Sequence, residues 1–426
     1  MRNNHPLIWA AALSLLCAAG GQLRAAELPT TAEKVSAAIR KASPGDTLVI
    51  ADGVYRDVRL ALQAAGDPEH PIVVRAQTPG KVIIEGCSDL RIAGSGIVVS
   101  GLWFRNGCSP TGSVIEYRQG SRHATGCRVT QCVIEGFNPG SRQTKGNWVQ
   151  LYGHNNRFDH NTVVGKYNEG VTVAAILNDT DRQHHRIDHN YFGPRPVYGS
   201  NGAETIRTGN SFTSHTSSFI VIEDNYFDRC SGEVEIVSVK SGDNIIRRNC
   251  FSGLAGRRSF APLAVMDGVP DSPDYRYHPV TDVQITDNTF DDCTPILFGL
   301  GRDFERTVPP EGVLFARNRI NASRDGEVYT PCDDLSGITF SENRITDKRH
   351  FKLPDVAAVR KEQTGASWFD YTERACGSCR DGSSAWRRAA IRCSMPCRPR
   401  RRAMSSNWPH RANTGTMHPL PSATTS

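Results

Sequence analysis

Two glutamates and a lysine lie close together in one short segment, Gly-Glu-Val-Glu-Ile-Val-Ser-Val-Lys-Ser at residues 232–241. Neighbouring side chains of a β-strand point to opposite faces, so Glu233 and Glu235 would share one face, ~6.6 Å apart along the strand. Two carboxylates at that spacing repel each other unless a positive charge lies between them. A calcium ion suits this place because it takes several oxygen ligands in flexible geometry. The spacing alone leaves open a second interpretation, a ladder of solvated charges on the outer face of a sheet.

This segment has a counterpart earlier in the chain, because residues 202–211 align without gaps on residues 232–241, an offset of 30. If the two segments are neighbouring strands, the alignment stacks two pairs of residues: Ala203 on Glu233, and Thr205 on Glu235. Asn201 would then add an amide oxygen to the two carboxylates. Lys240 would fall on the opposite face of a regular strand, so we expect a bend around Ser238 to bring it to the same side.

Both segments belong to a stretch that repeats one pattern as far as about residue 345. Each unit begins with two apolar residues that are separated by one residue of any type. Two or so polar residues follow, then an asparagine, one residue of any type and a last apolar residue. The asparagine recurs at intervals of 24 to 39 residues: Asn161, Asn190, Asn225, Asn249, Asn288, Asn318 and Asn343. A minimum spacing in the mid-twenties with a variable excess is typical of a solenoid whose coils carry loops of different length.

We therefore predict an all-β fold, a right-handed parallel β-helix with a short N-terminal capping helix. Each coil would stack its strands ~4.8 Å from those of the coil before. The asparagines are expected in the turns, because asparagine tolerates unusual φ values and its amide can bond to the asparagines above and below. The helix is predicted within residues 31–42, where Val35, Ala38 and Ile39 recur at helical spacing.

The same stacking predicts the state of two cysteines. Cys230 and Cys293 each follow a repeat asparagine by five residues, with one coil between them. Two coil rises separate their Cα atoms by about 9.6 Å, beyond the roughly 7 Å that a disulfide can bridge. We therefore expect small, buried, free thiols.

Composition divides the chain into a main body and an atypical end. The 426 residues carry a formal net charge of +6. Residues 374–426 hold ten arginines and one acid, a charge of +9, which leaves −3 for residues 1–373. Net charge therefore gives no support for a nucleic-acid partner. We expect residues 26–373 to form the β-helix and residues 374–426 to be disordered or out of frame.

Residues 1–25 are predicted to be an export signal. Arg2 precedes an apolar run at residues 7–19, and the small residues Ala25 and Ala26 follow. The run is too short to span a bilayer comfortably. We therefore expect cleavage near Ala25 or Ala26, a periplasmic or secreted product and no membrane partner.

Four motifs follow one another along the chain: His185-Arg-Ile-Asp-His-Asn-Tyr-Phe-Gly-Pro-Arg-Pro196, Asn201-Gly-Ala-Glu-Thr-Ile-Arg207, the segment 232–241, and Met266-Asp-Gly-Val-Pro-Asp-Ser-Pro273. Together they resemble polysaccharide lyase family 6, the family of chondroitinase B and of β-helical alginate lyases. The likeness extends from about residue 48 to residue 347. It implies that Asn201, Glu233 and Glu235 bind Ca²⁺ and that Lys240 is the catalytic base.

The chain departs from the family pattern in one respect. The family's catalytic arginine lies in an Arg-His-Gly motif about one coil after the lysine, and no Arg-His-Gly occurs in this sequence. After Phe251 the sequence resembles a later coil of the family, as though about two coils were absent. The candidates for substrate binding are Arg207, in the second motif, and Arg257 and Arg258, at this junction.

The resemblance implies an exported, monomeric, calcium-dependent lyase that cleaves 1,4-linked uronate polymers by β-elimination. Calcium would neutralise the substrate carboxylate, a neutral Lys240 would remove the C5 proton, and the C4 oxygen would leave. The partner is an anionic polysaccharide, either alginate or a dermatan-type glycosaminoglycan. Alginate is favoured because no sulfate-binding pattern is legible. The absent arginine leaves two alternatives open, a non-catalytic β-helix that binds uronate polymers and a structural or adhesive solenoid.

Overall fold

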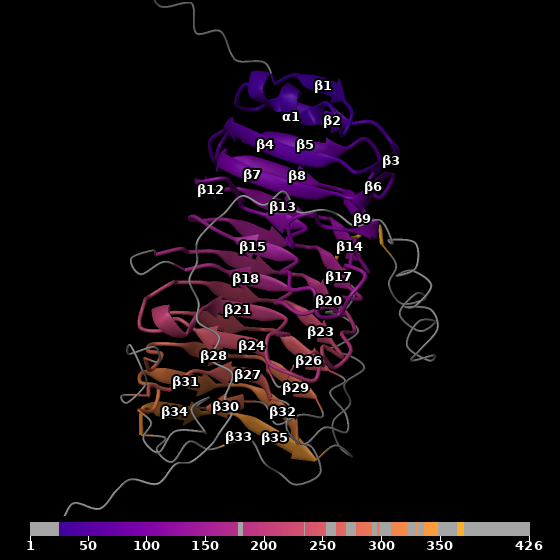
Figure 1. The fold of residues 1–426 in the computed structure, drawn as a ribbon. Coiled ribbons are helices and arrows are strands. Elements are labelled where there is room, and N and C mark those ends of the chain that lie inside the picture. Colours follow the sequence, from indigo (N-terminus) through magenta and orange to yellow (C-terminus); the bar gives the residue numbers. More distant parts are fainter. Residues whose placement is uncertain are drawn as a thin grey trace, which may run out of the picture.

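The computed structural model describes residues 25–177, 182–233, 235–252, 261–269, 278–291, 296–298, 308–322, 329–330, 336–347 and 364–369. Within these ranges the coils of the chain form three long sheets, here called A, B and C (Figure 1). From β13 onward, successive strands enter sheet A, sheet B and sheet C in turn, so each coil adds one strand to each sheet. Neighbouring strands pair in parallel, apart from the hairpin of β11 and β12. The predicted parallel β-helix is confirmed.

Sheet A contains β1 (Glu27–Thr30), β2 (Thr47–Ile50), β5 (Ile72–Ala76), β8 (Ile97–Ser100), β13 (Arg128–Thr130), β16 (Arg157–Asp159), β19 (Arg186–Asp188), β22 (Val221–Glu223), β25 (Ile245–Arg247), β28 (Gln284–Thr286), β31 (Val313–Ala316) and β34 (Ile338–Ser341). Sheet B contains β3 (Gly53–Arg56), β6 (Val82–Cys87), β9 (Leu102–Cys108), β14 (Val133–Glu135), β17 (Thr162–Val164), β20 (Tyr191–Phe192), β23 (Tyr226–Asp228), β26 (Cys250–Ser252), β29 (Thr289–Asp291), β32 (Arg319–Ala322) and β35 (Arg344–Asp347). Sheet C contains β4 (Arg59–Ala65), β7 (Asp89–Ser95), β10 (Ile115–Glu116), β11 (Arg118–Gln119), β12 (Arg122–Thr125), β15 (Val149–Leu151), β18 (Val173–Ala175), β21 (Ile206–Gly209), β24 (Glu235–Lys240), β27 (Ala261–Val265), β30 (Ile296–Phe298) and β33 (Tyr329–Thr330).

A short helical segment covers the N-terminal end of the solenoid, as predicted. It consists of the helix α1 (Val35–Ala38) and a 3-10 turn (Ile39–Lys41), so it is shorter than the predicted range. Val35 and Ile39 are fully buried in the main core, which closes the first coil. A second 3-10 turn lies at Ser211–Thr213. Among the described residues, no helix has the length and apolar character that a membrane crossing requires.

The repeat asparagines form a continuous hydrogen-bonded ladder. Asn190 Oδ1 accepts bonds from the Asn161 main-chain N–H at 3.0 Å and from Asn161 Nδ2 at 3.2 Å. The same two bonds join every following pair of ladder residues as far as Asn343. Each coil therefore holds the next through side-chain amides as well as through strand pairing, and the predicted amide ladder is confirmed.

The unusual φ angle lies on the residue before each asparagine, so our placement of it on the asparagine is wrong. Seven residues that precede ladder asparagines have φ between +51° and +58°: His160, His189, Asp224, Arg248, Asp287, Arg317 and Glu342. Few non-glycine residues adopt this left-handed conformation. The bonds of the following asparagine hold the turn in place, and this leaves the side chain at the left-handed position free to vary.

The interior contains stacked aromatic rings, because identical positions of successive coils meet one another. Phe192, Phe227, Phe251 and Phe290 are all buried, with successive ring centroids 5.0, 4.6 and 5.1 Å apart. Cys230 is a buried free thiol, as expected, and burial raises its pKa to about 12. Cys293 lies outside the described residues. Cys87, for which we made no prediction, is disulfide-bonded.

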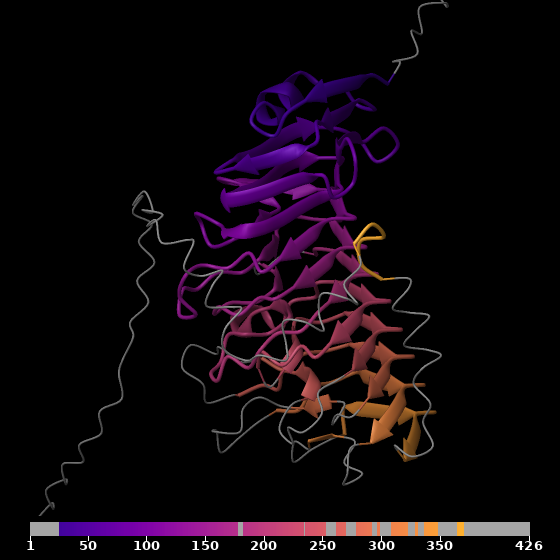
Figure 2. The same cartoon turned by 90° about the vertical axis from the view of Figure 1, so that its right-hand side faces the viewer.

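A short segment near the C-terminus, the C-terminal strap (residues 364–369), lies against the outside of sheet B, beside coils far earlier in the chain (Figure 2). Its polar groups bond to one coil after another: Gly365 N–H to His189 O, Ala366 N–H to Thr162 Oγ1, Ser367 N–H to Gln131 Oε1, and Trp368 Nε1 to Gln131 O. Trp368 and Phe369 also pack on Trp103, with centroids 6.1 and 5.5 Å away. The strap therefore spans several coils from outside.

We expect the strap to stabilise the fold and the residues after 373 to be dispensable. A variant that ends at residue 373 should keep the melting temperature of the full chain, since no periodic pattern in that end predicts docking on the coils. A variant that ends at residue 363 loses the burial of Phe369, which alone contributes about 1.5–3 kcal/mol, and its melting temperature should fall. Thermal unfolding of both variants checks this. A fall of about ten degrees in the longer variant, several kcal/mol in a chain of this size, would show that the end covers part of the solenoid.

Candidate functional site

The two motifs that we expected to stack are adjacent strands of sheet C. The pairing of β21 with β24 joins Ile206 to Val237 and Gly209 to Lys240, an offset of 31. The predicted offset of 30 is therefore wrong within the strands, and so is the pairing of Thr205 with Glu235, because Thr205 N–H bonds to Ile236 O. The irregularity lies just before β21, where a gapless alignment cannot reveal it. An error of one residue matters because it exchanges the two faces of a strand.

Three buried carboxylates gather in front of these strands. Glu204, Glu233 and Glu235 are 1%, 8% and 6% exposed. Glu233 Oε2 accepts bonds from the main-chain N–H groups of Gly202 at 2.8 Å and Ala203 at 2.5 Å, so the expected contact of Ala203 with Glu233 is present. Both carboxylate oxygens of Glu204 and Oε2 of Glu235 lack a hydrogen-bond partner among the described residues. Buried carboxylate oxygens without partners are costly, and a bound cation removes that cost.

The pKa shifts of Glu233 and Glu235 agree with a need for a cation. Burial, together with the negative charges of Glu204 and Glu235, raises the pKa of Glu233 to about 7. Burial also raises the pKa of Glu235, while the charge of Lys240 opposes the shift. The site thus holds more negative charge than its surroundings offset.

Two cations face these carboxylates from sheet C. Lys240 Nζ lies 4.0 Å from Glu204 Oε1, and Arg207 Nη1 lies 3.6 Å from the same oxygen. The Lys240 side chain is 12% exposed and that of Arg207 26%, so both side chains lie at the partly exposed edge of a mostly buried cluster. Lys240 therefore lies beside Glu204, and its charge also acts on Glu235; the roles of Lys240 and the glutamates stay predictions.

The bend that brings Lys240 to this side does not lie at Ser238. Val237 and Val239 both point into the core, as alternate residues of a regular strand do. The alternation breaks earlier, because Ile236 and Val237 are neighbours in sequence and both belong to the main core.

The donor set suits a calcium ion. Calcium prefers carboxylate and amide oxygens. The site supplies three buried carboxylates, and two of them, Glu204 and Glu235, have oxygens without a hydrogen-bond partner. The exposed Asn201 precedes Gly202, whose N–H bonds to Glu233. The side chains are not gathered into a finished coordination sphere, since no three His, Cys, Asp or Glu side chains of the described part form a ready metal site. The fit therefore rests on the chemistry and burial of the donors, and their final positions would be taken up with the ion.

Glu204 is the residue that the sequence analysis missed. It lies inside the quoted motif 201–207, but the offset of 30 placed its neighbours, Ala203 and Thr205, opposite the two glutamates. A search for acidic residues in both aligned segments would have included it. Arg257 and Arg258 lie outside the described residues.

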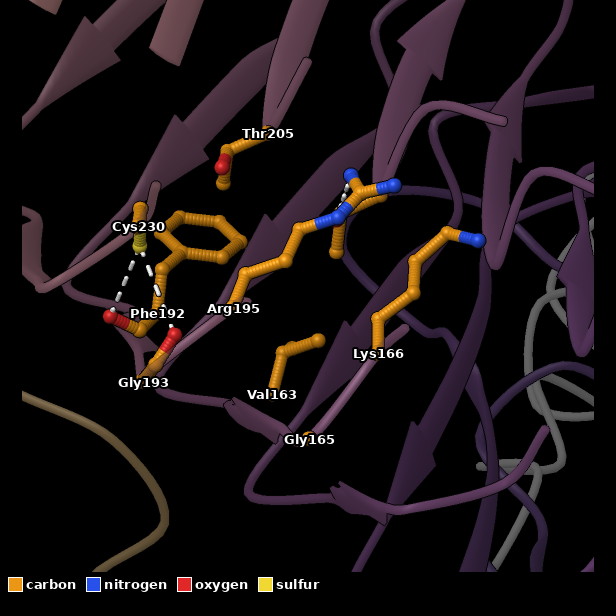
Figure 3. A pocket seen from close by; sticks show the side chains of 9 residues that line it. Val163, Gly165, Lys166, Phe192, Gly193, Arg195, Thr205 and Cys230 are labelled. Atoms are coloured by element: carbon orange, nitrogen blue, oxygen red, sulfur yellow. Dashed lines mark hydrogen bonds between the residues drawn. The ribbon is translucent and has the colours of Figure 1, made fainter. Parts of the chain in front are cut away.

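Two further buried cations line a small cavity, and the charge of one of them, Arg195, acts on Glu204 and Glu233. The cavity is lined by Lys166, Thr172, Arg195, Thr205 and Cys230, among others (Figure 3). The Cys230 thiol closes one side of it by donating to the carbonyl oxygens of Phe192 and Gly193, at 3.3 and 3.4 Å. Lys166 and Arg195 are 2% and 4% exposed. Neither residue was singled out from the sequence.

Comparisons with known proteins agree with this architecture. The sequence model of the chondroitinase B family matches residues 30–258 and 246–328. The structure of AlyGC, a PL6 family alginate lyase, is 40% identical, with a TM-score of 0.61 over 75% of this chain. This chain covers 51% of the AlyGC chain, about half its length. A mannuronic acid specific family 6 lyase from human gut microbiota is 27% identical, with a TM-score of 0.62 over 82% of this chain and 98% of that one. No curated protein sequence matches the chain.

Proposed function

Because the chain belongs to polysaccharide lyase family 6, the family of chondroitinase B, we propose that it cleaves a 1,4-linked uronate polymer by β-elimination with the help of calcium. The observation that carries this proposal is the approach of Lys240 and Arg207 to Glu204, whose two buried carboxylate oxygens, like Oε2 of Glu235, lack hydrogen-bond partners. A basic side chain beside a cation-binding group is what removal of a proton next to a carboxylate requires.

The chain's own residues would act as follows. Glu204, Glu233 and Glu235, with Asn201, would hold the calcium ion, which when bound neutralises the uronate carboxylate. Lys240 Nζ, as the free amine, would take the C5 proton of the sugar. The C4–O bond then breaks, a C4–C5 double bond forms, and the leaving oxygen receives a proton. The Arg207 guanidinium, 26% exposed, would orient the sugar carboxylate.

Alginate is the substrate that we propose first. The two relatives compared above that exceed 25% identity are an alginate lyase and a mannuronic acid specific lyase. A dermatan-type glycosaminoglycan remains the second candidate, since the matching family model is that of chondroitinase B. We also propose that residues 1–25 direct export to the periplasm or medium and that the protein acts as a monomer without nucleic-acid or membrane partners.

A second candidate function is binding of uronate polymers without cleavage. It is favoured by one observation, the absence of an Arg-His-Gly motif from the whole sequence. Incubation of the full chain with alginate, mannuronate and guluronate blocks and dermatan sulfate, with calcium or with a chelator, separates the two functions. Calcium-dependent release of unsaturated uronate ends supports the lyase. Calcium-dependent binding without unsaturated product supports the second function, and failure to bind calcium contradicts both.

The carboxylates should determine calcium affinity. We expect Glu233→Gln combined with Glu235→Gln, and Glu204→Gln alone, each to weaken calcium binding at least about tenfold, because charged ligands become neutral. Isothermal titration calorimetry measures this. Glu223→Gln is the matched control, since Glu223 is also buried but bonds to Arg247 and Arg248 in sheet A. It should lose stability and keep calcium affinity. Unchanged affinity in the double variant would place the ion elsewhere.

A further inference from the structure

Arg195 is a buried cation that the proposed chemistry does not use. It follows β20 in the chain and is 4% exposed. Among the described residues, no carboxylate lies within ion-pair distance of its guanidinium. A buried charge without a direct counterion is expensive, so such a residue needs other compensation. Figure 3 shows its side chain extended along the cavity beside the site.

The compensation comes from oxygens of two neighbouring segments. Nη1 donates to Thr172 Oγ1 at 3.1 Å and to the Glu204 carbonyl oxygen at 2.8 Å. Nη2 donates to the carbonyl oxygens of Asn168 at 3.0 Å and Gly170 at 2.8 Å. The guanidinium therefore fastens the main chain of Glu204 to the segment of the preceding coil.

The main chain of Arg195 meets the segment that leads to Glu233. It forms a bridge with Cys230, and its carbonyl oxygen accepts the Ser231 N–H at 3.0 Å. Gly232 packs directly on the side chain, because a Cβ at Gly232 would lie 2.7 Å from Arg195 Nε. One residue thus contacts the chain immediately before Glu233 and the main chain of Glu204.

We propose that Arg195 is a positioning residue that sets the relative placement of the Glu204 and Glu233 carboxylates, and through them the geometry of the bound cation. The inference rests on the proposed function, in that it assumes a cation held by these glutamates. Arginine suits this position because its guanidinium is a rigid, planar group of hydrogen-bond donors that reaches four acceptors in two segments.

Charge supports the same role. Burial lowers the pKa of Arg195 to about 10, and the nearby charges of Glu204 and Glu233 oppose that shift. The guanidinium therefore offsets part of the repulsion between the carboxylates when they are brought together. Removal of such outer partners of metal ligands typically lowers metal affinity about 10- to 100-fold.

Lys166 provides a matched control. It is 2% exposed and lines the same cavity, and its Nζ donates to Gly146 O at 2.9 Å and to the carbonyl oxygen of Asn168 at 3.1 Å. None of its hydrogen bonds reaches the segments that carry Glu204 or Glu233. Loss of Lys166 therefore removes a buried cation without releasing the carboxylates.

The test uses terbium as the probe in the full chain without substrate. Luminescence lifetimes in H₂O and D₂O count the waters on the bound ion, and titration gives the affinity. We expect Arg195→Met to bind terbium about 10- to 100-fold more weakly and to admit additional water to the ion. Arg195→Lys, which keeps the charge and loses the fork, should fold and show the same added water. Lys166→Met should match the wild type in hydration.

Three outcomes would overturn the proposal. Unchanged hydration in both Arg195 variants shows that the residue does not position the ligands. An equal change in Lys166→Met shows a general effect of cavity disruption. A wild-type chain without saturable terbium binding removes the site itself and with it the proposed calcium dependence. Because no substrate is present, failure of lyase activity alone leaves the inference standing. Melting temperatures of all variants identify any that fail to fold, and Arg195→Lys then decides the result.

Discussion

Lys240→Ala is expected to lower kcat/KM on the preferred uronate polymer about 10²- to 10⁴-fold relative to the parent chain. The expectation follows from the place of the amino group, which lies beside the cluster of carboxylates and at the edge of the buried site. No other described lysine lies within ion-pair distance of Glu204, Glu233 or Glu235. Continuous measurement of the unsaturated product checks this.

Two further variants separate a proton acceptor from a simple positive charge. Lys240→Arg keeps the charge but cannot act as a base near neutral pH, so its activity should be as low as that of the alanine variant. Lys145→Ala removes an exposed lysine whose Nζ lies 3.8 Å from Glu169, and activity should persist. Substantial activity in Lys240→Arg would contradict the assignment of Lys240 as base.

The parent chain is itself expected to be a slow lyase. Loss of one positioned charge or proton-transfer partner typically costs about 10²- to 10⁴-fold in rate, and the family's Arg-His-Gly is absent. Arg257→Ala and Arg258→Ala should lower activity only if one of these residues has taken over that role. Activity equal to that of an intact relative, unaffected by either variant, would mean that another residue serves in place of the missing arginine.

The second large effect is expected from His185 at acid pH. His185 is fully buried, and its Nδ1 accepts the Asn156 main-chain N–H at 3.2 Å. Burial, together with the charges of His154 and His184, lowers its pKa to about 3. The folded state therefore keeps the ring neutral, whereas the unfolded chain binds a proton below about pH 6.5. Stability from this residue is complete above pH 6.5 and is lost as the pH falls towards 3, by at most about 5 kcal/mol.

The solenoid offers a replacement for this histidine. Asn156 occupies the same position one coil earlier, and its Oδ1 accepts the Cys127 N–H at 2.9 Å. We expect His185→Asn to keep the accepted bond, to remain folded and to lose less stability than the parent between pH 6.5 and pH 4. Urea unfolding at several pH values measures this. Parallel loss of stability in both chains would assign the acid sensitivity to other groups.

The features that the sequence predicted well are those that repeat. The asparagine ladder could be read because the same polar residue recurs in every coil, and one correct bond implies the rest. The register of β21 and β24 could not be predicted, because the strand pairing shifts by one residue at a single place, just before Ile206. Glu204 was missed for the same reason. The C-terminal strap has no periodicity at all, and its partners, such as Gln131, lie more than 230 residues away in the chain.

The strap has a consequence for the way the molecule comes apart. In a solenoid each repeat contacts only its neighbours, so terminal coils can fray while the middle stays folded. Hydrogen bonds from Gly365, Ala366 and Ser367 reach three successive coils, and Trp368 and Phe369 pack on a fourth through Trp103. Opening any one of these coils therefore disturbs a segment shared with the others. The strap couples the unfolding of this half of the solenoid and makes it more cooperative than nearest-neighbour stacking alone would.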